Sequence, residues 1–122
     1  MANRYLFIII AVLCSFSQGL AQYPAVENEL DKKVKAFLKD NAENWGDMNI
    51  PINDGKILYD IIVENNFKNS VEIGTSTGHS AIWIAWALSK TGGKLITIEI
   101  DKRRNLKAKS NLKKAGVDKL EK

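Results

Sequence analysis

The sequence predicts an α/β fold: a Rossmann-like parallel sheet with flanking helices, of which the chain contains the N-terminal part only. Residues 71–89 pass from a β-favouring run through a turn of small residues into a helical stretch, and residues 95–114 repeat the change from strand to helix. Such alternation is typical of parallel sheets built from βαβ units. At 122 residues the chain is shorter than most complete cofactor-dependent enzyme folds.

The composition excludes several classes of protein. One cysteine, two prolines and 45% hydrophobic residues do not fit a disulfide-stapled, collagen-like or intrinsically disordered chain. Residues 102–122 hold nine Lys and Arg against two Asp and Glu. Because Leu106 and Leu112 interrupt this basic run at helical spacing and no aromatic residue does, we interpret it as a solvated outer helix face, with no nucleic acid as partner. The run consists of Lys102, Arg103, Arg104, Lys107, Lys109, Lys113 and Lys114.

The first 21 residues have the pattern of an export signal. Arg4 precedes an uninterrupted apolar stretch over residues 5–14, and Gly19 and Ala21 are small residues where a signal peptidase reads the chain. We therefore expect a signal peptide over residues 1–21 and a periplasmic or secreted protein. Ten apolar residues are too few to span a bilayer comfortably. Cleavage would leave no stable membrane span, whereas an uncleaved segment would anchor the chain.

Two amphipathic helices are predicted before the first strand. Apolar residues recur three and four positions apart within residues 22–43, and again within residues 57–62. Pro51 lies in the loop between the two helices. Asp54 is expected to cap the second helix, which should end near Asn65.

The first strand, turn and helix are expected at residues 71–73, 74–78 and 79–89. Trp83 and Trp86 lie on the predicted helix at helical spacing. We expect both rings to pack against the sheet rather than to form a substrate platform.

A second strand and helix are expected to follow at residues 95–100 and 103–114. Thr91-Gly92-Gly93 separates them from the preceding helix. Gly116 is expected to end the last helix in the left-handed conformation that glycine adopts readily.

A small-molecule site is expected where the two strands end. Ligands of open parallel sheets bind beyond the carboxyl ends of the strands, where glycines let the backbone approach closely and a helix N-terminus presents amides. Gly74 and Gly78 stand at these positions. Glu99 ends the second predicted strand, where its carboxylate could accept both hydroxyls of a ribose. Glu72 would be a half-buried carboxylate that needs a cation or several donors.

The turn is poorly suited to a phosphate. Ser76 replaces the middle glycine of the Gly-x-Gly-x-x-Gly pattern, no third glycine follows, and there is no Gly-Lys-Ser/Thr of a P-loop. A ligand with a ribose and an amino-acid tail fits better. An NAD-linked Rossmann oxidoreductase stays an alternative, as does a non-catalytic exported binding module.

Residues 71–80, Val-Glu-Ile-Gly-Thr-Ser-Thr-Gly-His-Ser, resemble the first motif of the class I S-adenosylmethionine-dependent O-methyltransferases of the catechol and caffeoyl-CoA group. Leu-Ile-Thr-Ile-Glu-Ile-Asp at 95–101 is similar to their second motif, and Met-Asn-Ile at 48–50 to a cofactor-contacting loop. The likeness covers about residues 44–118. We interpret residues 44–122 as the N-terminal, incomplete part of such a domain.

The resemblance implies S-adenosylmethionine as cofactor and gives roles to particular side chains. Glu72 and Gly74 would line its methionine end, and Ser80 would bind its carboxylate. Glu99 would hold the ribose, and Ile100 would pack on the adenine. The implied set also includes Ile50 through its backbone and Thr75, Ser76 and Gly78 from the turn. His79 stands where the family usually has an aromatic residue.

The resemblance also implies a reaction for the whole protein: transfer of a methyl group to the hydroxyl of a small-molecule substrate, aided by a divalent cation. In the family the metal-ligating aspartates and the general base come later than this chain's last residue. No catalytic residue and no metal ligand is therefore assigned here, and we expect a fragment that is inactive on its own. Assembly into a homo-oligomer stays open.

Overall fold

The computed structural model describes residues 26–120, so the signal peptide expected at residues 1–21 lies outside the described residues. The described chain forms α1 (Glu29–Asp40), α2 (Ile52–Glu64), β1 (Asn69–Ile73), α3 (His79–Thr91), β2 (Lys94–Ile98) and α4 (Lys102–Ala115), with 3₁₀ turns at Ala42–Asn44 and Asp118–Leu120. The two strands are parallel, with Asn69 paired to Lys94 and Ile73 to Ile98. The predicted α/β fold with a parallel sheet and flanking helices is confirmed.

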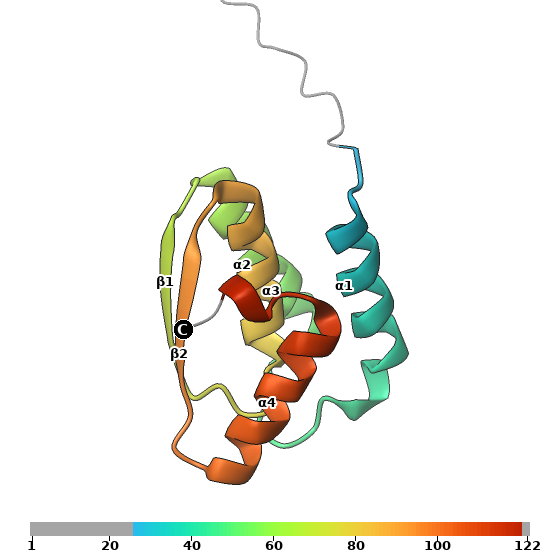
Figure 1. Cartoon of the computed structure of the whole chain (residues 1–122), viewed down its shortest axis with the longest axis vertical. Helices are drawn as coiled ribbons and strands as arrows, with labels where there is room; N and C mark the ends of the chain where they lie inside the picture. The colour runs from blue at the N-terminus through green and yellow to red at the C-terminus, as the bar shows by residue number, and fades with distance from the viewer. Residues whose placement is uncertain (1–25, 121–122) are drawn as a thin grey trace, which may run out of the picture.

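The helices lie on one side of the sheet, with α1 outermost (Figure 1). Side chains alternate along each strand, so every second residue faces the helices. On that side Leu95 is buried, and Glu72 and Thr97 are half-buried. The opposite side exposes the apolar side chains of Val71, Ile73, Ile96 and Ile98. Within residues 26–120 the sheet therefore has one covered face.

Local side-chain chemistry explains where several helices begin and end. Asn28 accepts a hydrogen bond from the amide of Asp31, and Asp31 accepts one from the amide of Asn28, which is a capping box at the start of α1. Asp101 caps α4 by accepting from the amide of Arg104 at 2.8 Å. As expected, α4 ends at Gly116, whose φ is 84°.

Some predicted boundaries are wrong. Asp54 does not cap α2, because the helix begins at Ile52, directly after Pro51. The carbonyl of Pro51 already accepts the amide of Asp54 at 3.1 Å, which places the Asp54 carboxylate in the first turn, a favourable position for a negative charge. β2 ends at Ile98, so Glu99 lies in the connection to α4 rather than in the strand.

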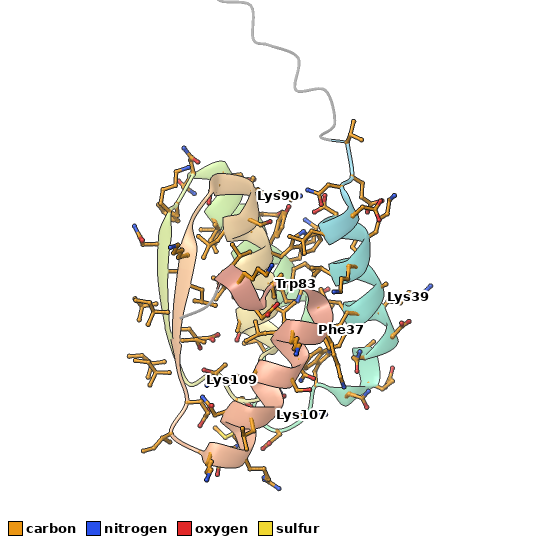
Figure 2. The ribbon with its side chains drawn as sticks, in the orientation of Figure 1. Phe37, Lys39, Trp83, Lys90, Lys107 and Lys109 are labelled. Carbon is orange, nitrogen blue, oxygen red and sulfur yellow. The ribbon has the colours of Figure 1, made fainter. Side chains whose placement is uncertain are left out.

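The hydrophobic core fills the space between the sheet and the helices. The side chains that are fully buried include Val34, Ile82, Leu88, Leu95, Leu112 and Val117. Phe37, a partly buried residue of α1, packs against this core. Phe37 and Trp83 lie in the interior between the helices, whereas Lys39 points outward (Figure 2).

The prediction that Trp83 and Trp86 pack against the sheet is wrong. The ring of Trp86 lies 4.5 Å from that of Tyr59 on α2, and its indole N–H donates to Asp31 on α1 at 2.6 Å. Trp83 covers Gly55 of α2, where an added Cβ would come within 2.3 Å of the indole ring. The two large rings therefore bridge α3 to the outer helices.

Asp31 is a buried carboxylate that anchors α1 to α3. It accepts from the indole of Trp86 and from the amide of Asn28, and it forms an ion pair with Lys90. Burial raises the pKa of Asp31, but the hydrogen bonds from Lys90, Trp86 and Asn28 outweigh it and hold the pKa at about 2, against an ordinary value of 3.8. The charged carboxylate therefore stabilises the fold.

We expect Asp31→Asn to lower the free energy of unfolding by about 2 kcal/mol at pH 7. Because the pKa of Asp31 is lower in the folded state, the stabilisation is complete above about pH 4 and is lost as the pH falls toward 2. Urea unfolding at pH 7 and pH 2 should show the difference between the variant and the original protein shrinking at low pH. Asp40→Asn, at an exposed carboxylate of the same helix, is the control and should not destabilise. Equal stability of Asp31→Asn and the original protein at pH 7 would contradict this account.

We expect Gly55→Ala to destabilise the fold by about 1–3 kcal/mol, even though alanine favours helices, because the new methyl group would displace Trp83. Gly46→Ala is the matched control, since no heavy atom lies within 4 Å of a Cβ built there. Thermal unfolding of both variants tests this. A Gly55→Ala variant as stable as Gly46→Ala would show that the contact between α2 and α3 tolerates the methyl group.

Candidate functional site

The carboxyl ends of β1 and β2 bring Glu99 against the turn at residues 74–78. One carboxylate oxygen of Glu99 accepts the amide of Ser76 at 2.7 Å, and the other accepts the amide of Asp101 at 2.9 Å. The carboxylate of Glu99 therefore contacts the turn directly. A carboxylate has about four lone-pair sites, so Glu99 retains the capacity to accept two further donors, such as a pair of hydroxyls.

The two glycines of the turn serve different purposes. Gly74 has a φ of 92°, and a Cβ built there would meet no heavy atom within 4 Å, so its surface is open to a ligand. Gly78 has a φ of 98°, and a Cβ there would lie 3.3 Å from the backbone of Ala108, so it lets the turn pack closely on α4. Asn111 of α4 strengthens this contact by donating to the carbonyl of Thr77 at 2.8 Å.

Glu72 is held between the strands and the start of α3. Its carboxylate accepts from the hydroxyl of Ser80 and, at 2.5 Å, from the hydroxyl of Thr97. The hydroxyl of Thr97 also lies 2.5 Å from that of Thr75. These donors offset the cost of burying the carboxylate, as the sequence required. Ser80 therefore donates its single hydroxyl proton to Glu72.

The remaining predicted residues differ in exposure. Thr75 and Ser76 are buried, and their hydroxyls contact protein groups. The carbonyl of Ile50 lies 2.9 Å from Nδ1 of His79, which places the loop before α2 beside the start of α3. The side chain of Ile100 is 99% exposed. The structure thus gathers the predicted polar residues at the strand ends, with Ile100 as a bare apolar surface next to Glu99.

His79 is a buried structural residue. Its ring stacks on Trp45 with a centroid distance of 4.5 Å and an interplanar angle of 13°. A neutral ring with its proton on Nδ1 donates to the carbonyl of Ile50 and accepts the indole N–H of Trp83 at 3.1 Å. Burial lowers the pKa of His79, and the hydrogen bond to Ile50 opposes that effect only in part.

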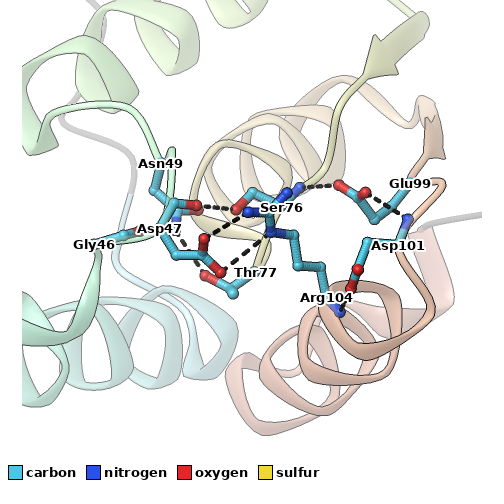
Figure 3. A network of polar contacts seen from close by, with 8 residues as sticks. All are labelled: Gly46, Asp47, Asn49, Ser76, Thr77, Glu99, Asp101 and Arg104. Carbon is cyan, nitrogen blue, oxygen red and sulfur yellow. Dashed lines mark hydrogen bonds and ion pairs between the residues drawn. The ribbon is translucent and has the colours of Figure 1, made fainter.

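Sequence reasoning missed the contact between Asp47 and Arg104 (Figure 3). Nη2 of Arg104 lies 2.7 Å from one carboxylate oxygen of Asp47, and Nε lies 3.2 Å from the other. The hydrogen bond from Arg104 is the main reason that the pKa of Asp47 is lowered. Arg104 is the half-buried cation of the basic run, whereas the other cations of the run are exposed. One signal existed: Arg104 shares a four-residue spacing with Ala108 and Leu112, both of which are buried.

An apolar cavity of about 390 Å³ lies elsewhere, between α1, α2 and α3, and is lined by Tyr59, Trp83 and Trp86 among others. None of the predicted cofactor residues lines it, so we place the candidate site at the strand ends. Among residues 26–120 no three His, Cys, Asp or Glu side chains form a group that could hold a metal ion. No helix in the same range is long and apolar enough to cross a membrane.

Comparison with known proteins agrees with the fold. A family model described as O-methyltransferase matches residues 21–121. The chain is 33% identical over 96 residues to tapetum-specific methyltransferase 1 of Arabidopsis thaliana, covering 79% of this chain and 40% of that protein. It is 42% identical over 65 residues to catechol O-methyltransferase of Niastella koreensis, covering 53% of this chain and 29% of that protein. The chain therefore spans less than half the length of these relatives.

A solved structure gives the same result in three dimensions. The O-methyltransferase from Bacillus cereus, crystallised in complex with SAH, superposes with a TM-score of 0.62 at 29% identity. The match covers 75% of this chain and 42% of the Bacillus protein.

His79 is the only histidine of the chain, so its ring signals in an NMR titration can be assigned without ambiguity. We expect a titration midpoint below 6.5 in the folded protein, because burial disfavours the charged ring. Since the folded-state pKa is the lower one, the stability that the neutral ring contributes is present above pH 6.5 and decreases as the pH falls. The same signal in urea is the control and should titrate near 6.5. A folded-state midpoint at or above the urea value would refute the buried neutral ring.

Proposed function

Because this chain belongs to the O-methyltransferase family, we propose that it binds S-adenosylmethionine at the carboxyl ends of β1 and β2, and that the whole protein methylates a hydroxyl of a small molecule. The observation that carries the proposal is the position of Glu99 against the Gly74–Gly78 turn, with its carboxylate held by two backbone amides. The SAH named with the Bacillus cereus relative supports the choice of ligand.

The residues present fit this cofactor. The open surface of Gly74 admits a ligand close to the backbone, and the spare lone pairs of Glu99 suit the two hydroxyls of a ribose. The exposed side chain of Ile100 offers an apolar surface to the adenine. Glu72, a half-buried carboxylate, suits the amino group of the methionine end. When bound, the cofactor supplies a methyl group on a positively charged sulfur.

The chain's own residues bind and orient in this proposal. Glu99 fixes the ribose and Glu72 holds the amino group of the amino-acid tail. Ser80 orients Glu72 by donating its hydroxyl proton to that carboxylate, and the turn keeps these contacts in one geometry. No catalytic residue is assigned. A divalent cation, implied by the family resemblance for the whole protein, finds no ligand set among residues 26–120, so no step is assigned to it.

Two alternatives from the sequence are kept as outcomes of the test. An NAD-linked oxidoreductase would use Glu99 in the same way, but Ser76 takes the place of the glycine that leaves room for a pyrophosphate. A non-catalytic exported module would use the fold for packing alone. Export itself stays a proposal that rests on the pattern of residues 1–21.

We expect S-adenosylhomocysteine to bind the full chain with saturation in isothermal titration calorimetry and to raise its melting temperature by mass action. Glu99→Gln should weaken binding about tenfold or more, because a carboxylate accepts the ribose hydroxyls more strongly than an amide does. Glu64→Gln is the matched control. Glu64 is an exposed glutamate at the end of α2, shortly before β1 begins, whereas Glu99 follows the end of β2, so substitution of Glu64 should leave the affinity unchanged.

NAD is titrated in parallel. Saturable binding of NAD without binding of S-adenosylhomocysteine would establish the oxidoreductase alternative, and no response to either ligand would favour the binding module. Equal loss of affinity in Glu64→Gln and Glu99→Gln would remove Glu99 from the site.

A further inference from the structure

The loop at residues 46–50 reaches the candidate site from outside the sheet, and Arg104 of α4 holds it there. We infer that Arg104 is a positioning residue, whose ion pair with Asp47 fastens this loop to the cofactor turn and thereby raises the affinity for the adenosyl cofactor. The inference rests on the proposed function for its ligand. It goes beyond it by giving a role to a pair of residues outside the predicted cofactor-binding set.

The contacts around the loop form a closed ring (Figure 3). Starting from Glu99, each member of the ring is joined to the next: Glu99 to the amide of Asp101, Asp101 to the amide of Arg104, Arg104 to the carboxylate of Asp47, the carbonyl of Asp47 to the hydroxyl of Ser76, and the amide of Ser76 back to Glu99. The ring joins three chain segments that are far apart in sequence. Of its links, only that between Arg104 and Asp47 joins two side chains, so it can be removed by substitution at either partner.

The conformation of the loop needs support from contacts outside it. Asp47 and Met48 have φ values of 54° and 63°, and Ser76, opposite them, has a φ of 49°. Residues other than glycine avoid this left-handed region because Cβ crowds the backbone carbonyl. Asn49 supplies some support by donating to the carbonyl of Gly46 at 2.6 Å and to Thr77 at 2.7 Å. The two-pronged contact from Arg104 adds a constraint that a single hydrogen bond lacks.

Order in the loop also lowers the entropic cost of binding a ligand. A loop that is ordered before the ligand arrives loses less conformational entropy on binding, so the ligand binds more tightly. The side chains of Arg104 and Asp47 are 29% and 43% exposed, so salt reaches the pair and weakens it. The affinity for the cofactor should therefore fall with ionic strength in the original protein, and fall less where the pair is absent.

The chain offers well-matched variants. Asp47→Asn removes the charge but keeps a residue that tolerates positive φ, so the fold of the loop is not lost for steric reasons. Arg104→Gln removes the guanidinium, and Arg104→Lys restores the charge without the two-pronged geometry. Lys109→Gln is the control, because it removes one positive charge from an exposed residue of the same helix that is not in the ring.

The experiment measures two quantities on the full chain: amide hydrogen exchange of residues 46–50 without ligand, and the affinity for S-adenosylhomocysteine at low and high salt. We expect Asp47→Asn and Arg104→Gln each to speed loop exchange several-fold and to weaken binding about three- to tenfold, with a smaller salt dependence. Arg104→Lys should recover part of both effects. The double variant should be no weaker than either single variant, since one interaction is lost in all three. Lys109→Gln should match the original protein.

Unchanged loop exchange in Asp47→Asn and Arg104→Gln overturns the inference, whatever the ligand does. Faster exchange with unchanged affinity also overturns it, because the pair would then order the loop without serving the ligand. If the original protein does not bind S-adenosylhomocysteine, the proposed function fails, and so does the inferred effect of the ion pair on affinity. Faster loop exchange in the variants would then show only that Arg104 holds the loop.

Discussion

The parallel pairing of β1 with β2 decides where the polar groups of the site lie. With Ile73 beside Ile98, both strands end at the same edge of the sheet. The carbonyl of Ile98 accepts the amides of Gly74 and Thr75, at 2.8 and 3.3 Å, so the turn leaves β1 while attached to the end of β2. If β2 slipped by one residue against β1, Thr97 would turn away from the helices and its hydroxyl would lose its contacts with Glu72 and Thr75.

α3 satisfies buried polar groups as well as filling space. The indole N–H of Trp86 donates to Asp31 on α1, and that of Trp83 donates to His79 in the first turn of α3 itself. Both tryptophans of α3 therefore fix a polar group as well as packing their rings. α1 is consequently held to α3 by a directional contact in addition to apolar packing, and His79 holds the loop before α2 through the carbonyl of Ile50.

Much of the fold could be predicted because hydrophobic periodicity and glycine placement are local signals. Strand, turn and helix at residues 71–89 and the end of α4 at Gly116 follow from the chain alone. The errors come from tertiary contacts that leave weak local traces. α2 begins directly after Pro51 and not at Asp54 as expected. The tryptophans of α3 pack against the outer helices, and hydrophobic periodicity does not show which element a helix face contacts.

The candidate site divides in the same way. Glu99 and the two glycines of the turn could be placed because motif spacing and the topology of parallel sheets constrain them together. The pair between Asp47 and Arg104 could not, because 57 positions separate its members and the charge of Arg104 was one of many in a basic run. The sequence shows the chemical nature of a side chain, but it predicts the partner of that side chain only where the topology of the fold brings the two together.

The bare side of the sheet has a consequence for handling the protein. Val71, Ile73, Ile96 and Ile98 form a continuous β-branched and aliphatic surface, and Val71 and Ile73 are 67% and 84% exposed. In a two-stranded sheet each strand also has one edge with unpaired backbone groups. An exposed apolar surface beside such an edge favours association between molecules. Concentrated solutions of residues 26–120 should therefore self-associate, and dilution or a mild detergent should keep the polypeptide dispersed.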